Sequence, residues 1–119
     1  MKLRVAINGF GRIGRVFLRS VLNHPKIEVV AINDLSTSKI MSHLFKYDSI
    51  HRIFQGYVEH KKDSIIINGY SINYTSISNP EDLPWKDLKV DLVIECTGCF
   101  KTKALASKHI IAGAKKVII

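Results

Sequence analysis

The sequence predicts an α/β fold, a doubly wound parallel sheet with a small antiparallel hairpin insertion. Short apolar runs alternate with amphipathic stretches, a glycine-rich turn joins the first such pair, and an Asn-Gly pair separates two β-prone runs. Alternation of strand and helix is typical of βαβ units and hence of a parallel sheet. A chain of 119 residues is long enough for one domain that buries its core without disulfides or metal.

The first strand–helix unit occupies the amino-terminal part of the chain. Residues 3–8 (LRVAIN) form a short apolar strand, and a helix is expected from about Arg12 to Asn23, where Pro25 stops it. Its apolar face is expected to contain Ile13, Val16, Phe17 and Val21.

A second strand–helix unit follows directly. Residues 28–33 (EVVAIN) are rich in Val and Ile and predict a second buried strand. Ser36, Thr37 or Ser38 can cap the next helix. The apolar side of that helix is expected to contain Ile40, Met41, Leu44 and Phe45.

The middle of the chain departs from this alternation. Residues 64–74 read SIIINGYSINY, two β-prone runs around Asn68 and Gly69, which is the strongest short-range signal for a hairpin. We expect this hairpin to be an antiparallel decoration on the parallel core.

The last third returns to the alternating pattern. Residues 80–86 can form one turn of helix, and residues 90–95 (VDLVIE) predict another strand. A helix over residues 102–112 is expected to end at Gly113, a natural C-cap. Residues 115–119 (KKVII) form one more strand.

The apolar end of the sequence predicts an incomplete sheet. Exposure of Val117, Ile118 and Ile119 would forgo roughly 5–9 kcal/mol of burial. That is comparable with the ~5–15 kcal/mol that stabilises a whole domain. We therefore expect the fold to be truncated after about the fifth parallel strand. A partner chain that covers this edge is the alternative.

Composition restricts the classes of function. The net charge of +8 comes from basic residues spread along the chain, with no stripe of interleaved aromatics, so nucleic-acid binding is not expected as a main function. No apolar run approaches the ~18 residues of a membrane span, and no signal peptide precedes the glycine-rich segment. Together with only two cysteines, this favours a cytoplasmic protein without a membrane partner.

Residues 9–14 (GFGRIG) form a G-x-G-x-x-G motif between a predicted strand and a predicted helix. In this context Gly9 permits the tight turn and Gly11 lets the backbone approach a pyrophosphate. Gly14 lets the helix pack closely on the strand. The sequence thus predicts a Rossmann-type dinucleotide site.

Two further features complete the predicted site. The N–H groups of Arg12 and Ile13, in the first helical turn, are placed to bind phosphate oxygens. Asp34 follows the second strand, 20 residues after Gly14, where a carboxylate binds the adenosine ribose. Its charge would repel a 2′-phosphate, so NAD is favoured over NADP. The alternative is an ordinary glycine turn, with Asp34 capping the following helix.

The remaining reactive side chains indicate neither catalysis nor a metal site. Cys96 and Cys99 imitate a thioredoxin-type C-x-x-C, but that fold does not begin with a dinucleotide motif, so two incidental thiols are the better interpretation. The five histidines lack metal-ligand spacing, and His43 is expected to be packed. Trp85 is expected to anchor the connection into the next strand.

The chain resembles the amino-terminal part of phosphorylating glyceraldehyde-3-phosphate dehydrogenase. The resemblance spans essentially all 119 residues and is carried by residues 7–15 (INGFGRIGR), 33–35 (NDL), 43–49 (HLFKYDS), 82–85 (DLPW), 95–98 (ECTG) and 112–117 (AGAKKV).

This resemblance implies an NAD-binding domain at residues 1–119 of a homotetrameric glycolytic enzyme. That enzyme oxidises a phosphorylated aldehyde through a cysteine thiohemiacetal and thioester and releases an acyl phosphate. The cofactor-binding residues that it implies are Asn8, Gly9, Gly11, Arg12, Ile13, Gly14, Asp34, Ser78, Thr97, Gly98 and Phe100.

The sequence departs from the family pattern at a few positions. Ser78 replaces a basic residue near the adenine, and Cys96 stands where serine is common. Cys99 stands where an apolar residue is usual. Neither cysteine is the family nucleophile, which lies beyond Ile119 with its histidine and the phosphate-binding arginines. We therefore expect this stretch to bind cofactor but to lack the catalytic domain and any catalytic residue.

Three alternatives stay open. Erythrose-4-phosphate dehydrogenase is the nearest relative, although it tends to carry Glu in place of Asp34. A non-catalytic NAD-binding module would bind the cofactor without reducing it. An inert remnant of a decayed gene would be unfolded or absent from cells, an interpretation that the intact glycine motif, Asp34 and the hairpin argue against.

Overall fold

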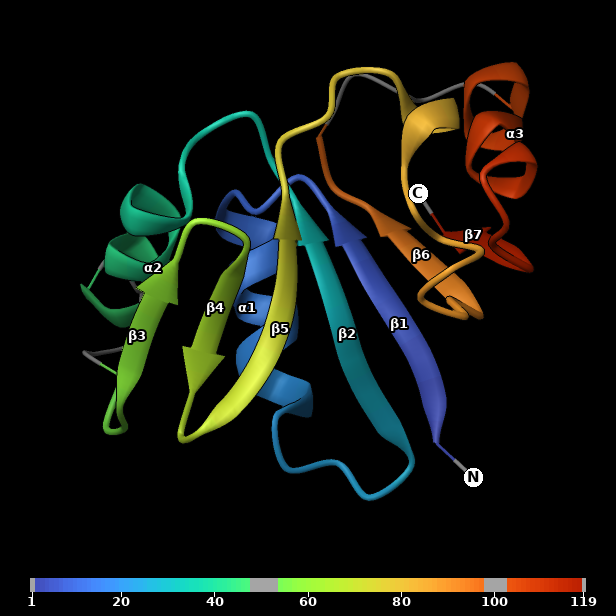
Figure 1. The fold of residues 1–119 in the computed structure, drawn as a ribbon. Helices are drawn as coiled ribbons and strands as arrows, with labels where there is room; N and C mark the ends of the chain where they lie inside the picture. Colours follow the sequence, from blue (N-terminus) through green and yellow to red (C-terminus); the bar gives the residue numbers. More distant parts are fainter. Residues whose placement is uncertain (1, 48–53, 98–102, 119) are drawn as a thin grey trace.

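The structure, a computed structural model, describes residues 2–47, 54–97 and 103–118 (Figure 1). Its elements are β1 (Leu3–Asn8), α1 (Arg12–Val21), β2 (Ile27–Asn33), α2 (Ser38–Tyr47), β3 (Val58–Lys61), β4 (Ser64–Ile67), β5 (Tyr70–Thr75), the 3-10 turn η1 (Pro80–Asp82), β6 (Leu92–Glu95), α3 (Lys103–Ile111) and β7 (Lys116–Ile118). The strands form one seven-stranded sheet in the order β3-β4-β5-β2-β1-β6-β7.

The predicted parallel core is confirmed. Strands β5, β2, β1, β6 and β7 are parallel, whereas β3 and β4 are antiparallel to their neighbours. From β1 the chain builds the sheet outward on one side through β2 and on the other through β6 (Figure 1). The carboxyl ends of β1 and β6 therefore meet at a topological switch point, where open α/β sheets bind their ligands.

The predicted hairpin is present, but its second arm is more than a decoration. Asn68 and Gly69 have φ values of 52° and 81°, the left-handed conformation that a two-residue hairpin turn requires. Beyond the turn, β5 pairs in parallel with β2 and so belongs to the core. The sequence analysis missed β3, whose residues are exposed or half-buried and form no apolar run.

Each face of the sheet is covered by its own hydrophobic cluster. Alternate residues of β1 illustrate the division: Ile7 packs with α1 and α2 on one face, whereas Ala6 packs around Trp85 on the other. Trp85 is fully buried, which agrees with its predicted role as an anchor for the connection into β6.

The buried face of α1 is only partly the predicted one: Val21 is buried and Phe17 packs against the same core cluster, as expected, but the other two residues are not. Ile13 and Val16 are 72% and 40% exposed, whereas Gly14 and Leu18 are buried. A Cβ on Gly14 would lie 2.6 Å from the Gly9 carbonyl oxygen, so the helix can approach the loop this closely only with a glycine at position 14. This close approach turns the Gly14 side of the helix inward and Ile13 outward.

The second helix is likewise only partly as predicted. Met41 and Phe45 are buried, but Ile40 is 51% exposed. His43, expected to be packed, is exposed and lies against Tyr47, with ring centroids 4.8 Å apart. Thr37 caps this helix, because its side-chain oxygen accepts the Ile40 N–H at 3.2 Å.

The helix α3 ends at the predicted glycine cap, and the strand β7 follows it as predicted. Gly113, with φ at 121°, follows α3 and donates to Ile110 O, and Ala114 donates to His109 O, which together form a Schellman cap.

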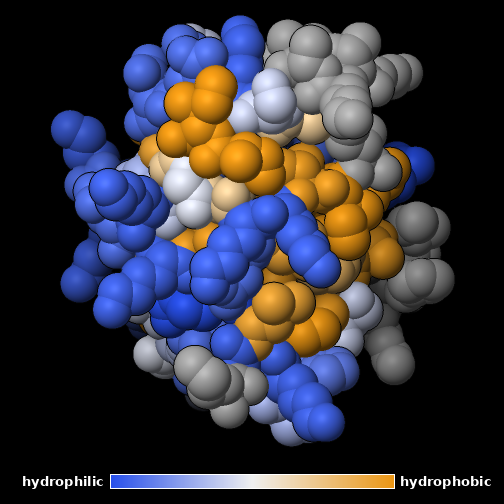
Figure 2. All heavy atoms as spheres, turned by 90° about the vertical axis from the view of Figure 1, so that its right-hand side faces the viewer, coloured by the Kyte–Doolittle hydropathy of each residue, from blue (hydrophilic) through white to orange (hydrophobic). Residues whose placement is uncertain are grey.

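Figure 2 shows an apolar band on the side of the molecule that carries α3 and β7. Exposed large apolar residues of these two elements include Ile110, Ile111 and Ile118. None of the helices in the described ranges is long and apolar enough to span a membrane.

Candidate functional site

A pocket of about 320 Å³ opens at the switch point of the sheet. It is lined by Asn8, Gly9, Gly11, Asn33, Asp34, Leu35, Ile77, Ser78, Cys96 and Thr97. These residues follow or end β1, β2, β5 and β6, so the pocket is built from the carboxyl ends of neighbouring parallel strands. This location is the one at which a doubly wound sheet binds a dinucleotide.

The glycines of the predicted motif have different structural tasks. Gly9 has φ at 93°, and a Cβ there would lie 2.7 Å from the backbone nitrogen of Thr97. Gly11 has an ordinary φ of −78°, and a Cβ there would meet nothing within 4 Å. Gly9 is thus needed for the fold, whereas the space above Gly11 is open and fits a phosphate group close to the backbone.

The amino terminus of α1 faces this open space. Gly11 is its N-cap and supplies no side-chain hydrogen bond, and the first turn contains no acidic residue. Its first N–H groups, at Arg12 and Ile13, are therefore available to an anion, which the helix dipole also favours. Both residues are exposed, as binding from solvent requires.

Asp34 is joined to the glycine loop rather than to α2. Its Oδ2 accepts the backbone N–H of Phe10 at 2.8 Å, and its Oδ1 accepts that of Ser36 at 3.0 Å. Since Thr37 caps α2, the alternative role of Asp34 as a helix cap is wrong. The half-buried carboxylate retains free lone pairs in a pocket-lining position, the chemistry needed to bind ribose hydroxyls.

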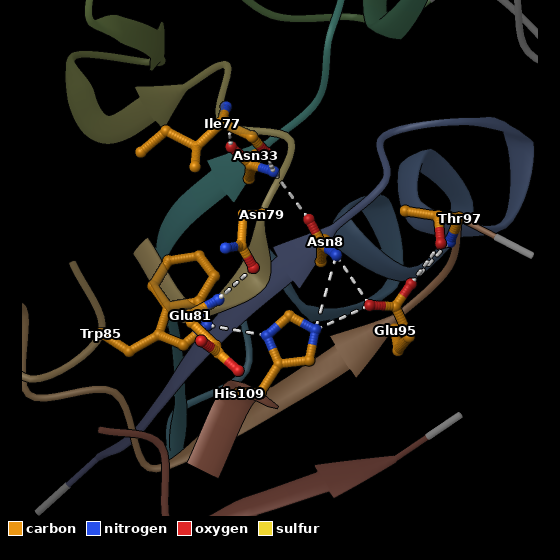
Figure 3. A network of polar contacts seen from close by, with 9 residues as sticks. All are labelled: Asn8, Asn33, Ile77, Asn79, Glu81, Trp85, Glu95, Thr97 and His109. Atoms are coloured by element: carbon orange, nitrogen blue, oxygen red, sulfur yellow. Dashed lines mark hydrogen bonds and ion pairs between the residues drawn. The ribbon is translucent and has the colours of Figure 1, made fainter. Parts of the chain in front are cut away.

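Beneath the pocket lies a buried polar network that the sequence analysis missed (Figure 3). Asn8 donates through Nδ2 to Glu95 Oε1 at 2.7 Å and accepts through Oδ1 from Asn33 Nδ2 at 2.8 Å. Asn33 Oδ1 accepts the Ile77 N–H at 2.9 Å, and so connects the network to the opposite wall of the pocket. Polar residues at the ends of apolar strands were the available sequence signal.

Glu95 is the junction of this network. Its Oε1 accepts from His109 Nε2 at 2.7 Å, and its Oε2 accepts the backbone N–H and the hydroxyl of Thr97 at 3.0 and 2.6 Å. Burial by itself raises the pKa of Glu95, but the hydrogen bonds from His109, Thr97 and Asn8 outweigh it and lower the pKa below its usual value. The carboxylate is therefore ionised although it is buried.

Cys96 is chemically quiet. Burial, together with the neighbouring Glu95 charge, raises the pKa of its half-buried thiol to about 11. A thiol that stays protonated near pH 7 is a poor nucleophile and a poor redox partner. This supports the interpretation of Cys96 as an incidental thiol, while Cys99 lies outside the described residues.

Most of the predicted site residues are brought together. Asn8, Gly9, Gly11, Asp34, Ser78 and Thr97 line the pocket, Arg12 and Ile13 begin α1 beside it, and Gly14 packs beneath. Gly98 and Phe100 lie outside the described residues. Within the part of the chain that the structure describes, no three His, Cys, Asp or Glu side chains are grouped to hold a metal ion.

Comparison with known proteins agrees with this geometry. Residues 3–103 match the family "Glyceraldehyde 3-phosphate dehydrogenase, NAD binding domain". The chain is 52% identical over 116 residues to glyceraldehyde-3-phosphate dehydrogenase of Clostridium acetobutylicum, with 98% of this chain and 35% of the relative covered. It is 54% identical over 118 residues to the enzyme of the same name from Thermotoga maritima, with the same coverage.

The chain spans about a third of the length of the curated relatives it matches. A relative from Buchnera aphidicola, also named glyceraldehyde-3-phosphate dehydrogenase, is 52% identical over 119 residues, which cover 100% of this chain and 36% of the relative. Because the family match extends over most of the sequence, the chain belongs to the glyceraldehyde 3-phosphate dehydrogenase family and contains that family's NAD-binding domain, whose cofactor is NAD.

Proposed function

We propose that the switch-point pocket binds NAD as the cofactor site of a phosphorylating aldehyde dehydrogenase. The N–H groups of Arg12 and Ile13 hold the pyrophosphate at the amino terminus of α1, and Asp34 binds the adenosine ribose. Ser78 lines the adenine side and Thr97 the nicotinamide side, with Gly98 and Phe100 following it in sequence. The observation that carries this proposal is the open space above Gly11, bordered by a helix terminus without a side-chain cap.

The whole protein's reaction is part of the proposal. A phosphorylated aldehyde and inorganic phosphate are converted to an acyl phosphate, and NAD, when bound, accepts the hydride. Residues 1–119 contribute cofactor binding, and a catalytic domain contributes the nucleophile; the working assembly is a homotetramer. Support comes from relatives that are named glyceraldehyde-3-phosphate dehydrogenase and are 52–54% identical to this chain over 98–100% of its length.

The chain's own residues then have three tasks. The Gly9–Gly14 loop brings backbone donors to the pyrophosphate without an intervening side chain. Asp34 adds a negative charge that accepts ribose hydroxyls and repels a 2′-phosphate. Glu95 holds Thr97, by two hydrogen bonds, at the rim of the pocket. None of these groups is proposed to react with substrate.

A titration of the full chain with NAD and with NADP tests the cofactor assignment. Calorimetry is expected to give saturable binding of NAD with a Kd at least tenfold lower than that of NADP, because the Asp34 carboxylate would lie beside the 2′-phosphate. Failure of NAD to bind, or tighter binding of NADP, would overturn the assignment.

Capture of the native protein on an NAD-type resin tests the proposed enzyme. An intact mass well above 13.4 kDa, with phosphate-dependent reduction of NAD by glyceraldehyde 3-phosphate, is the expected result. A higher kcat/KM for erythrose 4-phosphate would favour the related dehydrogenase. A captured protein of 13.4 kDa that binds NAD but reduces none of it would be a binding module.

A further inference from the structure

The network beneath the pocket contains a histidine whose protonation is defined by its partners. The indole N–H of Trp85 donates to His109 Nδ1 at 3.0 Å, and an indole nitrogen acts only as a donor. His109 Nδ1 is therefore the unprotonated nitrogen, and Nε2 carries the proton that it donates to Glu95 Oε1 at 2.7 Å. His109 is thus a neutral imidazole with a defined tautomer, and both Trp85 and His109 are fully buried.

The donor direction is transmitted onward to the pocket. Because ionised Glu95 only accepts hydrogen bonds, Asn8 must turn its Nδ2 toward it and its Oδ1 toward Asn33 Nδ2. Asn33 then presents its Oδ1 to the Ile77 N–H. Asn8 Nδ2 and His109 Nε2 also lie 3.5 Å apart, but both are donors and hence both serve Glu95. Each amide orientation follows from the one before it.

On the other side, Glu95 holds the wall of the pocket directly. Its Oε2 binds both the N–H and the hydroxyl of Thr97, which defines the backbone position and the rotamer of that residue. Thr97 packs so closely on Gly9 that the loop has no room for a Cβ. The position of Glu95 therefore decides where this wall stands relative to the glycine loop.

We propose that His109 is a positioning residue of the NAD site: locked by Trp85, it orients the Glu95 carboxylate, and Glu95 holds Thr97 at the nicotinamide side of the pocket. The proposal rests on the NAD assignment above and extends it to a residue that does not line the pocket. A purely structural role would not require a polar network, because buried polar groups stabilise a fold no better than well-packed apolar ones. Here three members of the network, Asn8, Asn33 and Thr97, reach the pocket itself.

The test compares three variants of the full chain by calorimetry with NAD and with AMP, which has only the adenosine half. His109→Leu keeps an apolar side chain of similar size but leaves Trp85 and Glu95 without their partner. His109→Gln supplies one donor and one acceptor and is the conservative rescue. Val90→Ala is the matched control, because Val90 is buried in the same cluster as Trp85 yet takes no part in the network.

We expect His109→Leu to raise the Kd for NAD about tenfold while the Kd for AMP stays within about twofold. The Glu95 carboxylate that orients Asn8 and Asn33 is retained in this variant, whereas the partner that positions it toward Thr97 is lost. His109→Gln is expected to recover most of the NAD affinity. Val90→Ala is expected to lower the melting temperature without changing the ratio of the Kd for NAD to the Kd for AMP. Equal weakening of both ligands, or an unchanged Kd for NAD in folded His109→Leu, would overturn the proposal.

A spectroscopic measurement decides the matter even if His109→Leu does not fold. Trp85 is the only tryptophan of the sequence, so its indole N–H gives a single resonance in a ¹⁵N–¹H spectrum. Saturation of the unmodified chain with NAD is expected to shift this resonance more than saturation with AMP does. An indole resonance that NAD leaves unchanged would refute the coupling although NAD binds, whereas absence of NAD binding in the unmodified chain would refute the proposed function itself.

Discussion

The Asp34 carboxylate accepts the backbone N–H of Phe10 at 2.8 Å, across 24 residues of sequence. This hydrogen bond joins the carboxyl end of β2 to the glycine loop after β1. Asp34, the residue proposed to bind the ribose, therefore also stabilises the loop proposed to bind the pyrophosphate. The carboxylate is therefore expected to contribute both to the stability of the glycine loop and to the affinity for NAD. The two contributions are separable by experiment.

Asp34→Asn is expected to reduce both stability and NAD affinity. The amide has one accepting oxygen in place of two, so either Phe10 or Ser36 loses its acceptor, at a cost of about 1 kcal/mol in the free energy of unfolding. Loss of the charge on the ribose side is expected to weaken NAD binding by about 1–3 kcal/mol and to narrow the preference over NADP. Urea unfolding and calorimetry measure the two effects, and an unchanged Kd for NAD would exclude Asp34 as a ligand.

Alanine substitutions at two glycines are expected to separate folding from binding. Gly11→Ala adds a Cβ in open space at an ordinary φ, so it should lower the free energy of unfolding by no more than about 1 kcal/mol. The same Cβ occupies the space proposed for the pyrophosphate and should raise the Kd for NAD at least tenfold.

The matched control is Gly9→Ala. Its positive φ and the approach to the Thr97 nitrogen should lower the free energy of unfolding by about 2 kcal/mol or more. If Gly11→Ala binds NAD as tightly as the unmodified chain, the pyrophosphate is not bound at this loop.

Glu95→Gln is expected to be costly above pH 5. The amide group of glutamine would present N–H donors to the donors of His109, Asn8 or Thr97, with an expected loss of about 1–3 kcal/mol in the free energy of unfolding.

The loss depends on pH in a defined direction. The pKa of Glu95 is lowered in the folded state, so its stabilising contribution is present above the unfolded value of 4.5 and disappears as the pH falls through the folded pKa. Urea titrations of both proteins from pH 7 downward should therefore converge. A difference that stays constant with pH would show that the carboxylate charge is not involved.

The Cys96 thiol is expected to react slowly. With a folded pKa of about 11, against 9.0 for an ordinary thiol, it is almost entirely protonated at pH 8. In a Cys99→Ser background, alkylation by iodoacetamide should be slow at pH 8 and should accelerate toward pH 11. Because the folded pKa is raised, the associated stability is present below pH 9 and decreases as the pH rises to about 11. Rapid stoichiometric alkylation of the folded protein at pH 8 would contradict this environment.

Local patterns in the sequence were sufficient for much of the fold. The Asn68-Gly69 turn, the cap at Gly113 and the strand–glycine–helix transition at residues 8–14 each rest on backbone conformations that few residue types allow. The composition of the strands, rich in Val and Ile, identified the core of the sheet in the same way. By contrast, β3 has a polar, exposed sequence, and only its pairing with β4 makes it a strand.

The orientation of α1 shows why periodicity alone was insufficient. Ile13 and Val16 satisfy a helical apolar repeat, yet they are exposed, because the contact between Gly14 and the Gly9 carbonyl decides which side faces the sheet. That contact depends on the three-dimensional shape of the turn, so the spacing of apolar residues along the helix does not reveal it. His43 was misplaced for a related reason, since the part of α2 that packs on the sheet is defined by β3 and β4.

By itself, the sequence determined the order of the elements other than β3, the glycine turn and the acid that follows β2, because these depend on spacing along the chain and on local backbone conformation. Only the tertiary structure decided that Glu95, His109 and Trp85 lie in one hydrogen-bonded network beneath the pocket. Those residues come from β6, α3 and the segment before β6. Their donor and acceptor roles are settled by mutual distance and burial, which a one-dimensional pattern does not contain.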